Sequence, residues 1–159
     1  MRIRSSLALC LLTLGTAALA QNKIDTTWHC LKPTNVQKLD VGDEPDHSYL
    51  IQQGTCTATS SKTGQKSGAF TEFHEAWKDS FTFHGRYNAT ADNGDMIFYT
   101  YEGSYDPKKP LANKWKIVKG TGKHKGEKGS GSCSGKANQD GSFDWECTWP
   151  TGMAAKAKG

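Results

Sequence analysis

Long apolar runs and a strong excess of one charge are both missing from most of this sequence. Beyond residue 20, no apolar run approaches the roughly 20 residues that a membrane-spanning helix requires, so no membrane span is predicted. The 159 residues carry a formal net charge of +4, and the main lysine-rich segment, residues 114–128, is interrupted by Glu127. Because a nucleic-acid-binding protein keeps a larger and more clustered basic excess, we expect no nucleic-acid partner.

The common catalytic and cofactor motifs are absent as well. There is no G-x-S-x-G nucleophile elbow and no H-E-x-x-H metalloprotease motif. The glycine-rich segment GTGKHKGEKGSGSCSG, residues 120–135, fails the P-loop pattern, because neither Gly122-Lys123 nor Gly135-Lys136 is followed by Ser or Thr. Lys125 stands where the dinucleotide-binding fingerprint needs its third glycine. No cofactor is therefore predicted, and these glycines are expected to be structural.

One apolar segment does stand at the start of the chain, MRIRSSLALCLLTLGTAALA. Two arginines precede a short apolar run that ends in Ala-Leu-Ala at positions 18–20, an order typical of a secretory signal peptide. We therefore expect residues 1–20 to be cleaved and the protein, beginning at Gln21, to be secreted or periplasmic. Removing 20 of the 159 residues leaves 139, and the loss of Arg2 and Arg4 lowers the net charge from +4 to +2.

Four of the five cysteines lie beyond this segment, at Cys30, Cys56, Cys133 and Cys147. An even number in a short exported chain predicts two disulfides, whereas no pair has the close spacing of a structural zinc site. A three-residue turn at residues 139–141 would place Cys133 opposite Cys147, near disulfide range. We predict that pair together with Cys30–Cys56. The rival is Cys30–Cys147, since both follow a Trp-x-Cys pattern and could be neighbours where a barrel closes.

Helical periodicity is nearly absent, and apolar residues alternate along short segments instead. The expected strands cover residues 48–61, 68–77, 80–90, 95–105, 113–120 and 142–149. Turn signals such as Asp92-Asn93-Gly94 separate them, and evenly spaced short strands indicate an all-β antiparallel barrel or sandwich. Residues 48–149 therefore form the expected domain. Residues 21–47 predict one short strand and a long loop, and residues 150–159 a disordered tail.

The segment GTGKHKGEKGSGS resembles the G-T-G-K-Y-x-G-x-x-G-x-G signature of the allene oxide cyclase-like barrel family, relatives of the dirigent proteins. DNGDMIFYTYEG, residues 92–103, is similar to the D-G-D strand of that family, and DGSFDWECTW to its closing hairpin. The resemblance spans residues 48–149 and implies a single antiparallel β-barrel of about eight strands with a central cavity. Because one fold carries many functions, it implies the fold rather than an activity. The glycines of the signature that we expect to shape the barrel are Gly120, Gly122, Gly129 and Gly131.

The best candidate for a cluster of chemically active side chains lies in the hairpin expected around residues 78–80. A three-residue loop there would place His74 opposite His84 and Glu72 opposite Arg86. Two imidazoles beside a carboxylate suit zinc, copper or nickel, whereas the simpler interpretation is a solvent-facing histidine pair next to an ion pair. We favour the simpler interpretation, so no metal is predicted, and His74 and His84 are the ligands of the alternative.

Acidic and aromatic residues on the expected strands are the remaining candidates for a ligand cavity. They are Glu75, Phe83, Tyr99, Tyr101 and Glu102. A carboxylate in an apolar cavity has its pKa raised by desolvation and can act as an acid or base, whereas aromatic strand residues usually pack. The sequence favours a non-catalytic exported barrel that holds a small apolar ligand or a surface partner. The alternative is a cyclase- or isomerase-like enzyme using a cavity carboxylate. No feature indicates an oligomeric state.

Overall fold

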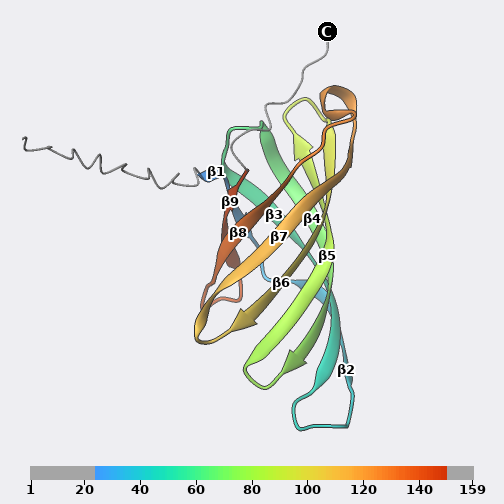
Figure 1. Cartoon of the computed structure of the whole chain (residues 1–159), viewed down its shortest axis with the longest axis vertical. Coiled ribbons are helices and arrows are strands. Elements are labelled where there is room, and N and C mark those ends of the chain that lie inside the picture. Colours follow the sequence, from blue (N-terminus) through green and yellow to red (C-terminus); the bar gives the residue numbers. More distant parts are fainter. Residues whose placement is uncertain (1–23, 150–159) are drawn as a thin grey trace, which may run out of the picture.

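Within residues 24–149, the part of the chain that the structure describes, the computed structural model consists of nine β-strands and one short 3₁₀ helix (Figure 1). The elements are β1 Ile24–Cys30, β2 Thr34–Asp40, β3 Ser48–Ser61, β4 Gln65–Trp77, β5 Ser80–Ala91, β6 Met96–Asp106, β7 Lys109–Gly120, η1 Gly122–His124, β8 Ser130–Ala137 and β9 Phe143–Thr148. No helix among these residues is long and apolar enough to cross a membrane. The predicted signal peptide and the predicted tail lie outside the described residues.

Alternation of buried and exposed side chains explains why these segments are strands. In β7, Leu111, Trp115 and Ile117 are buried, whereas Lys114 and Lys116 between them are exposed. A strand points successive side chains to opposite faces, so this pattern puts one apolar face inside and one lysine-rich face in water. The hydrophobic core accordingly lies in the space that this one curved sheet encloses, rather than between two separate layers.

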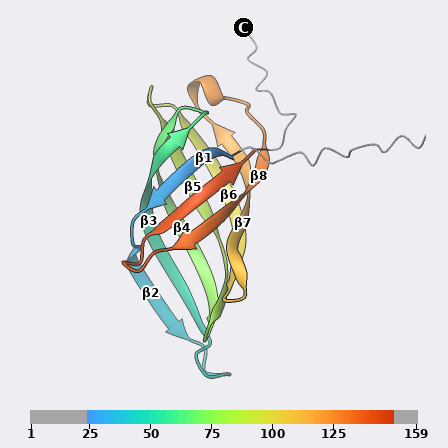
Figure 2. The same ribbon diagram turned by 90° about the vertical axis from the view of Figure 1, so that its left-hand side faces the viewer.

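Eight strands close into an antiparallel barrel in the order β1-β9-β8-β7-β6-β5-β4-β3, and the pairing of β1 with β3 completes the circle (Figures 1 and 2). Strand β1 covers the C-terminal half of β3, and β2 covers the N-terminal half of the same edge. Within residues 24–149, β2 has no strand on its other side. Strand β2 is therefore an extra edge strand. Where β1 pairs with β3, closure of the barrel leaves no free strand edge.

The N-terminal segment contributes more to the barrel than the sequence indicated. We expected one short strand in residues 21–47 and a domain beginning at residue 48, whereas the structure has two strands there and β1 closes the barrel. Thr26, Trp28 and Cys30 alternate inward along β1. All seven residues of β2 are exposed, so this strand has no burial pattern that a sequence could reveal. Its backbone pairing with β3 alone defines it.

Inward-facing glycines make room for aromatic rings on neighbouring strands. A Cβ atom added to any of five strand glycines would come within 3.0 Å of a ring atom, a distance that real Cβ atoms essentially never show. The pairs are Gly54 and Phe70, Gly68 and Tyr87, Gly103 and Phe83, Gly131 and Trp115, and Gly135 and Trp145. Glycine in a strand interior costs conformational entropy, but here it lets a large ring from the neighbouring strand lie against the sheet and fill the barrel interior.

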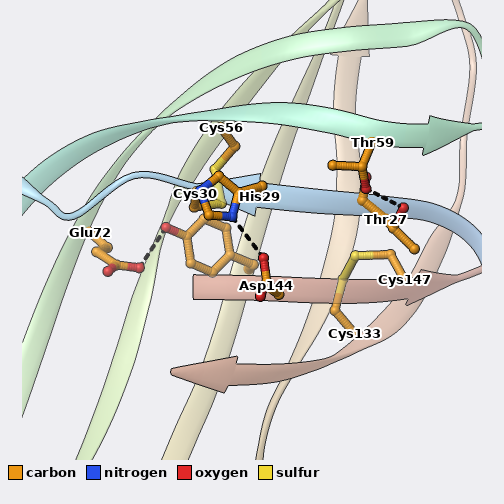
Figure 3. The surroundings of a disulfide bond; sticks show 10 residues. Thr27, His29, Cys30, Cys56, Thr59, Glu72, Cys133, Asp144 and Cys147 are labelled. Carbon is orange, nitrogen blue, oxygen red and sulfur yellow. Dashed lines mark hydrogen bonds and ion pairs between the residues drawn. A yellow bond between two sulfur atoms is a disulfide. The ribbon is translucent and has the colours of Figure 1, made fainter. Parts of the chain in front are cut away.

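Both disulfides link directly opposed residues on neighbouring strands (Figure 3). Cys30 of β1 is bonded to Cys56 of β3, and Cys133 of β8 is bonded to Cys147 of β9. These are the two predicted pairs, of which Cys133–Cys147 followed from the turn at residues 139–141, and the rival Cys30–Cys147 pair is not formed. The first disulfide fixes the seam where the barrel closes, and the second fixes the last hairpin.

Candidate functional site

Aromatic side chains surround a cavity of about 120 Å³ inside the barrel. Six of the lining residues are Trp28, Phe83, Tyr87, Tyr99, Trp115 and Trp145. Two pairs of these rings meet edge to face, Trp28–Tyr87 with centroids 5.2 Å apart and Tyr99–Trp115 at 5.6 Å. An engineered apolar cavity of about 150 Å³ holds benzene, so this space suits a molecule of about one ring.

One carboxylate faces this cavity, and it belongs to Glu72 of β4. Gln52 Nε2 donates to its Oε1 atom at 2.6 Å, and the Tyr101 hydroxyl donates to Oε2 at 2.8 Å, the contact drawn beside the labelled Glu72 in Figure 3. His74 Nε2 lies 2.9 Å from Oε1. The side chains of Glu72 and His74 are only 13% and 11% exposed. The site thus combines an apolar wall with a hydrogen-bonded polar cluster around Glu72.

Burial and hydrogen bonding act on Glu72 in opposite directions. Burial is the largest single effect and raises the pKa of the carboxyl, because the charged form loses hydration. The hydrogen bond and charge of His74, with the hydrogen bonds from Gln52 and Tyr101, together outweigh it, so the pKa of Glu72 lies below its ordinary value of 4.5. Burial and the nearby Glu72 charge raise the pKa of Tyr101, which keeps its hydroxyl protonated as a donor. Glu72 is therefore an ionised acceptor at neutral pH.

Glu72→Gln is expected to remove an acid-sensitive part of the free energy of unfolding. Because the pKa of Glu72 is lower in the folded than in the unfolded state, its contribution is fully present above about pH 4.5 and is lost as the pH falls through the folded pKa. Urea unfolding of both proteins between pH 3 and pH 7 should show their stability difference shrinking at acid pH. A difference that stays constant over this range would contradict the assignment.

The predicted histidine pair is wrong by one residue of register. Trp77 pairs with Ser80, so the β4–β5 turn has two residues rather than three, and His74 faces Phe83 while His84 faces Phe73. A change of register by one residue reverses which side chains of one strand share a face with those of its neighbour. His74 therefore points inward, whereas His84 points outward. Residues 24–149 contain no group of three or more His, Cys, Asp or Glu side chains placed to hold a metal ion.

The predicted cavity residues divide between the two faces of the sheet. Phe83, Tyr99 and Tyr101 line the cavity. Glu75 is on the outer face, where it accepts a hydrogen bond from the Tyr49 hydroxyl at 3.0 Å, and Glu102 is exposed on the outer face of β6. Neither glutamate lines the cavity. Successive side chains of a strand point to opposite faces, and the preceding residues, His74 and Tyr101, point inward. The alternation of β4 with a two-residue turn would have identified Glu72 as the inward carboxylate.

The glycine-rich segment binds a carboxylate of the protein itself. The backbone N–H of Lys123 donates to Asp95 Oδ2 at 2.9 Å, and the Thr121 hydroxyl accepts from Met96 N at 2.8 Å. Gly122 has a φ of 49°, and a Cβ atom there would overlap the Asp95 carboxylate. The segment thus clamps the β7–β8 connection to the β5–β6 turn, which agrees with the structural role expected of its glycines.

Asp95→Ala is expected to lower the melting temperature by more than combined replacement of Lys123, Lys125 and Lys128 by glutamine. The hydrogen bond from the Lys123 backbone, the largest effect, lowers the pKa of Asp95, so the loop favours the ionised carboxylate. The three lysine side chains are exposed, and exposed charges contribute little. Differential scanning calorimetry of the two variants measures this order. The reverse order would contradict the stabilising role assigned to the contact between Asp95 and the loop.

No protein-family model matches the sequence, and no curated protein matches it at a significant level. The cavity and its chemistry are therefore the basis on which a function can be argued.

Proposed function

We propose that this protein is an exported, disulfide-stabilised β-barrel that binds a small, mainly apolar ligand in its interior cavity without catalysing a reaction. The aromatic cavity of about 120 Å³ carries the proposal. Ligand sites are concave and mostly apolar, with a few polar groups that fix orientation. Since sites for drug-sized ligands measure about 300–1,000 Å³, the expected ligand is considerably smaller.

Export is part of the proposal and rests on two features of the chain. Residues 1–20 have the order of a secretory signal peptide, and the two disulfides suit an oxidising compartment such as the periplasm or the extracellular space. Intact-mass measurement of the protein exported by its own host should give a chain that begins at Gln21. A chain that retains residues 1–20 in the cytoplasm would contradict export.

We also propose that the protein belongs to the allene oxide cyclase-like barrel family. The supporting observations are the glycine signature in residues 120–131 and a closed, eight-stranded antiparallel barrel with a central cavity. A shared fold does not imply a shared reaction, so this membership adds nothing to the choice between binding and catalysis.

A cyclase- or isomerase-like enzyme is the second candidate, and Glu72 is the observation that favours it. A carboxylate that lines the cavity beside His74 could move a proton within a bound substrate. However, three donors occupy its oxygens and its pKa is lowered, which makes Glu72 a weaker base than a free carboxylate. Binding without catalysis is therefore the better-supported function.

Native mass spectrometry of protein purified from its own host tests the binding function. We expect a retained small-molecule adduct on the wild-type protein. Leu111→Trp adds a ring at a buried position in the cavity wall and should abolish the adduct, whereas Ala112→Trp adds the same ring to the exposed face of β7 and should leave it. An adduct that survives Leu111→Trp in a folded protein would place the ligand elsewhere.

A further inference from the structure

Four buried polar atoms in residues 24–149 have no hydrogen-bond partner, and all four belong to side chains that line the cavity. They are Thr26 Oγ1, the Tyr87 hydroxyl oxygen, Asn113 Oδ1 and Trp115 Nε1. Buried polar groups are nearly always paired, because an unpaired group loses its hydration without compensation. Their concentration in one cavity indicates that a ligand with polar atoms of its own completes the site.

The four groups specify which polar atoms such a ligand carries. The indole N–H of Trp115 can only donate a hydrogen bond, and the side-chain Oδ1 atom of Asn113 can only accept one. The hydroxyls of Thr26 and Tyr87 can do either. A ligand hydroxyl is the smallest group that both accepts from Trp115 and donates to one of the acceptors. A pure hydrocarbon would leave all four groups unpaired.

The charge of the cavity lining disfavours an anionic ligand. Glu72 supplies a carboxylate, and the cavity residues in the described part of the chain include no lysine or arginine. An anion such as a carboxylic acid would be buried near Glu72, with His74 as its only cationisable neighbour, and His74 is already bonded to Glu72. Because the four unpaired groups are themselves uncharged, a neutral ligand matches them best.

We propose that the cavity binds a neutral monocyclic phenol, with its ring among the aromatic side chains and its hydroxyl bonded to Trp115 Nε1 and to one of the unpaired acceptors. The volume of about 120 Å³ admits one ring with a small substituent. Trp115 and Asn113 lie two residues apart on β7 and therefore face the same side of the sheet. This inference rests on the proposed binding function and narrows its ligand from apolar to amphipathic.

Calorimetric titration of the protein with phenol, toluene and benzoate tests the inference, because the three probes share one ring and differ in polarity or charge. We expect phenol to bind at least about tenfold more tightly than toluene, and benzoate to bind at least about tenfold more weakly than phenol. Equal affinities for phenol and toluene would overturn the phenol assignment while leaving an apolar binding function intact. No binding of any probe would overturn both.

Two variants assign the hydroxyl to its partners. Trp115→Phe and Tyr87→Phe remove a polar atom and keep a ring, so each should reduce the phenol-to-toluene affinity ratio by about threefold or more. Tyr105→Phe removes a hydroxyl from a residue that does not line the cavity and should leave the ratio unchanged. Unchanged ratios in both cavity variants would overturn the assigned contacts. If either variant fails to fold, the probe series on the wild-type protein still decides the phenol assignment.

Discussion

Gly131→Ala is expected to destabilise the barrel by about 3 kcal/mol, at the upper end of the cost of overpacking. The added Cβ atom would lie closer than 3.0 Å to the backbone oxygen of Thr148 and to the ring of Trp115. The carbonyl belongs to neighbouring β9, so it cannot move away as the tip of a flexible side chain could. Thermal and urea unfolding of the variant measure the loss.

Two other positions on this part of the chain calibrate the result. Ser134→Ala changes an exposed residue of the same strand and should alter stability by no more than about 0.5 kcal/mol. Gly129→Ala should fall between the two, because its added Cβ meets the ring of Trp149 rather than backbone. Wild-type stability in Gly131→Ala would show that the glycines of the signature are not structural.

Replacing both Cys30 and Cys56 by alanine is expected to cost about 3.5 kcal/mol. A disulfide stabilises mainly by restricting the unfolded chain, and the chain-entropy relation gives about this value for a separation of 26 residues. The same relation gives about 3.0 kcal/mol for Cys133 and Cys147, which are 14 residues apart. Urea unfolding of the two double variants, compared with the oxidised wild type, measures both losses.

The connectivity behind this expectation has its own test. Peptide mapping under non-reducing conditions should recover the links Cys30–Cys56 and Cys133–Cys147. Recovery of a Cys30–Cys147 link would contradict the connectivity. Unchanged stability of the Cys30 and Cys56 double variant would contradict the role of that disulfide at the seam of the barrel.

Sequence alone determined the strand class of the chain and favoured the cysteine pairing that the structure has over the rival Cys30–Cys147 pair. Alternating apolar residues and regularly spaced turn signals require antiparallel strands, and these are local properties of the chain. The turn at residues 139–141 set the register of the last hairpin, which placed Cys133 opposite Cys147. The failed P-loop spacing, together with the family-like signature and the nearby Cys133, predicted a structural role for the glycine-rich segment, and Asp95 accepts a hydrogen bond from its backbone.

Only the tertiary structure decided which side chains enter the cavity. Residues 78 and 79 form a two-residue turn without a glycine to mark it, so the sequence could not distinguish it from a three-residue loop. That single residue of register decides whether Glu72 and His74 face inward as a hydrogen-bonded pair, and it separates His74 from His84. Strand β1 joins partners far away in the sequence, β3 and β9, and no local pattern encodes such a closure. The four unpaired polar atoms come from β1, β5 and β7, and only closure of the barrel brings these strands around one cavity.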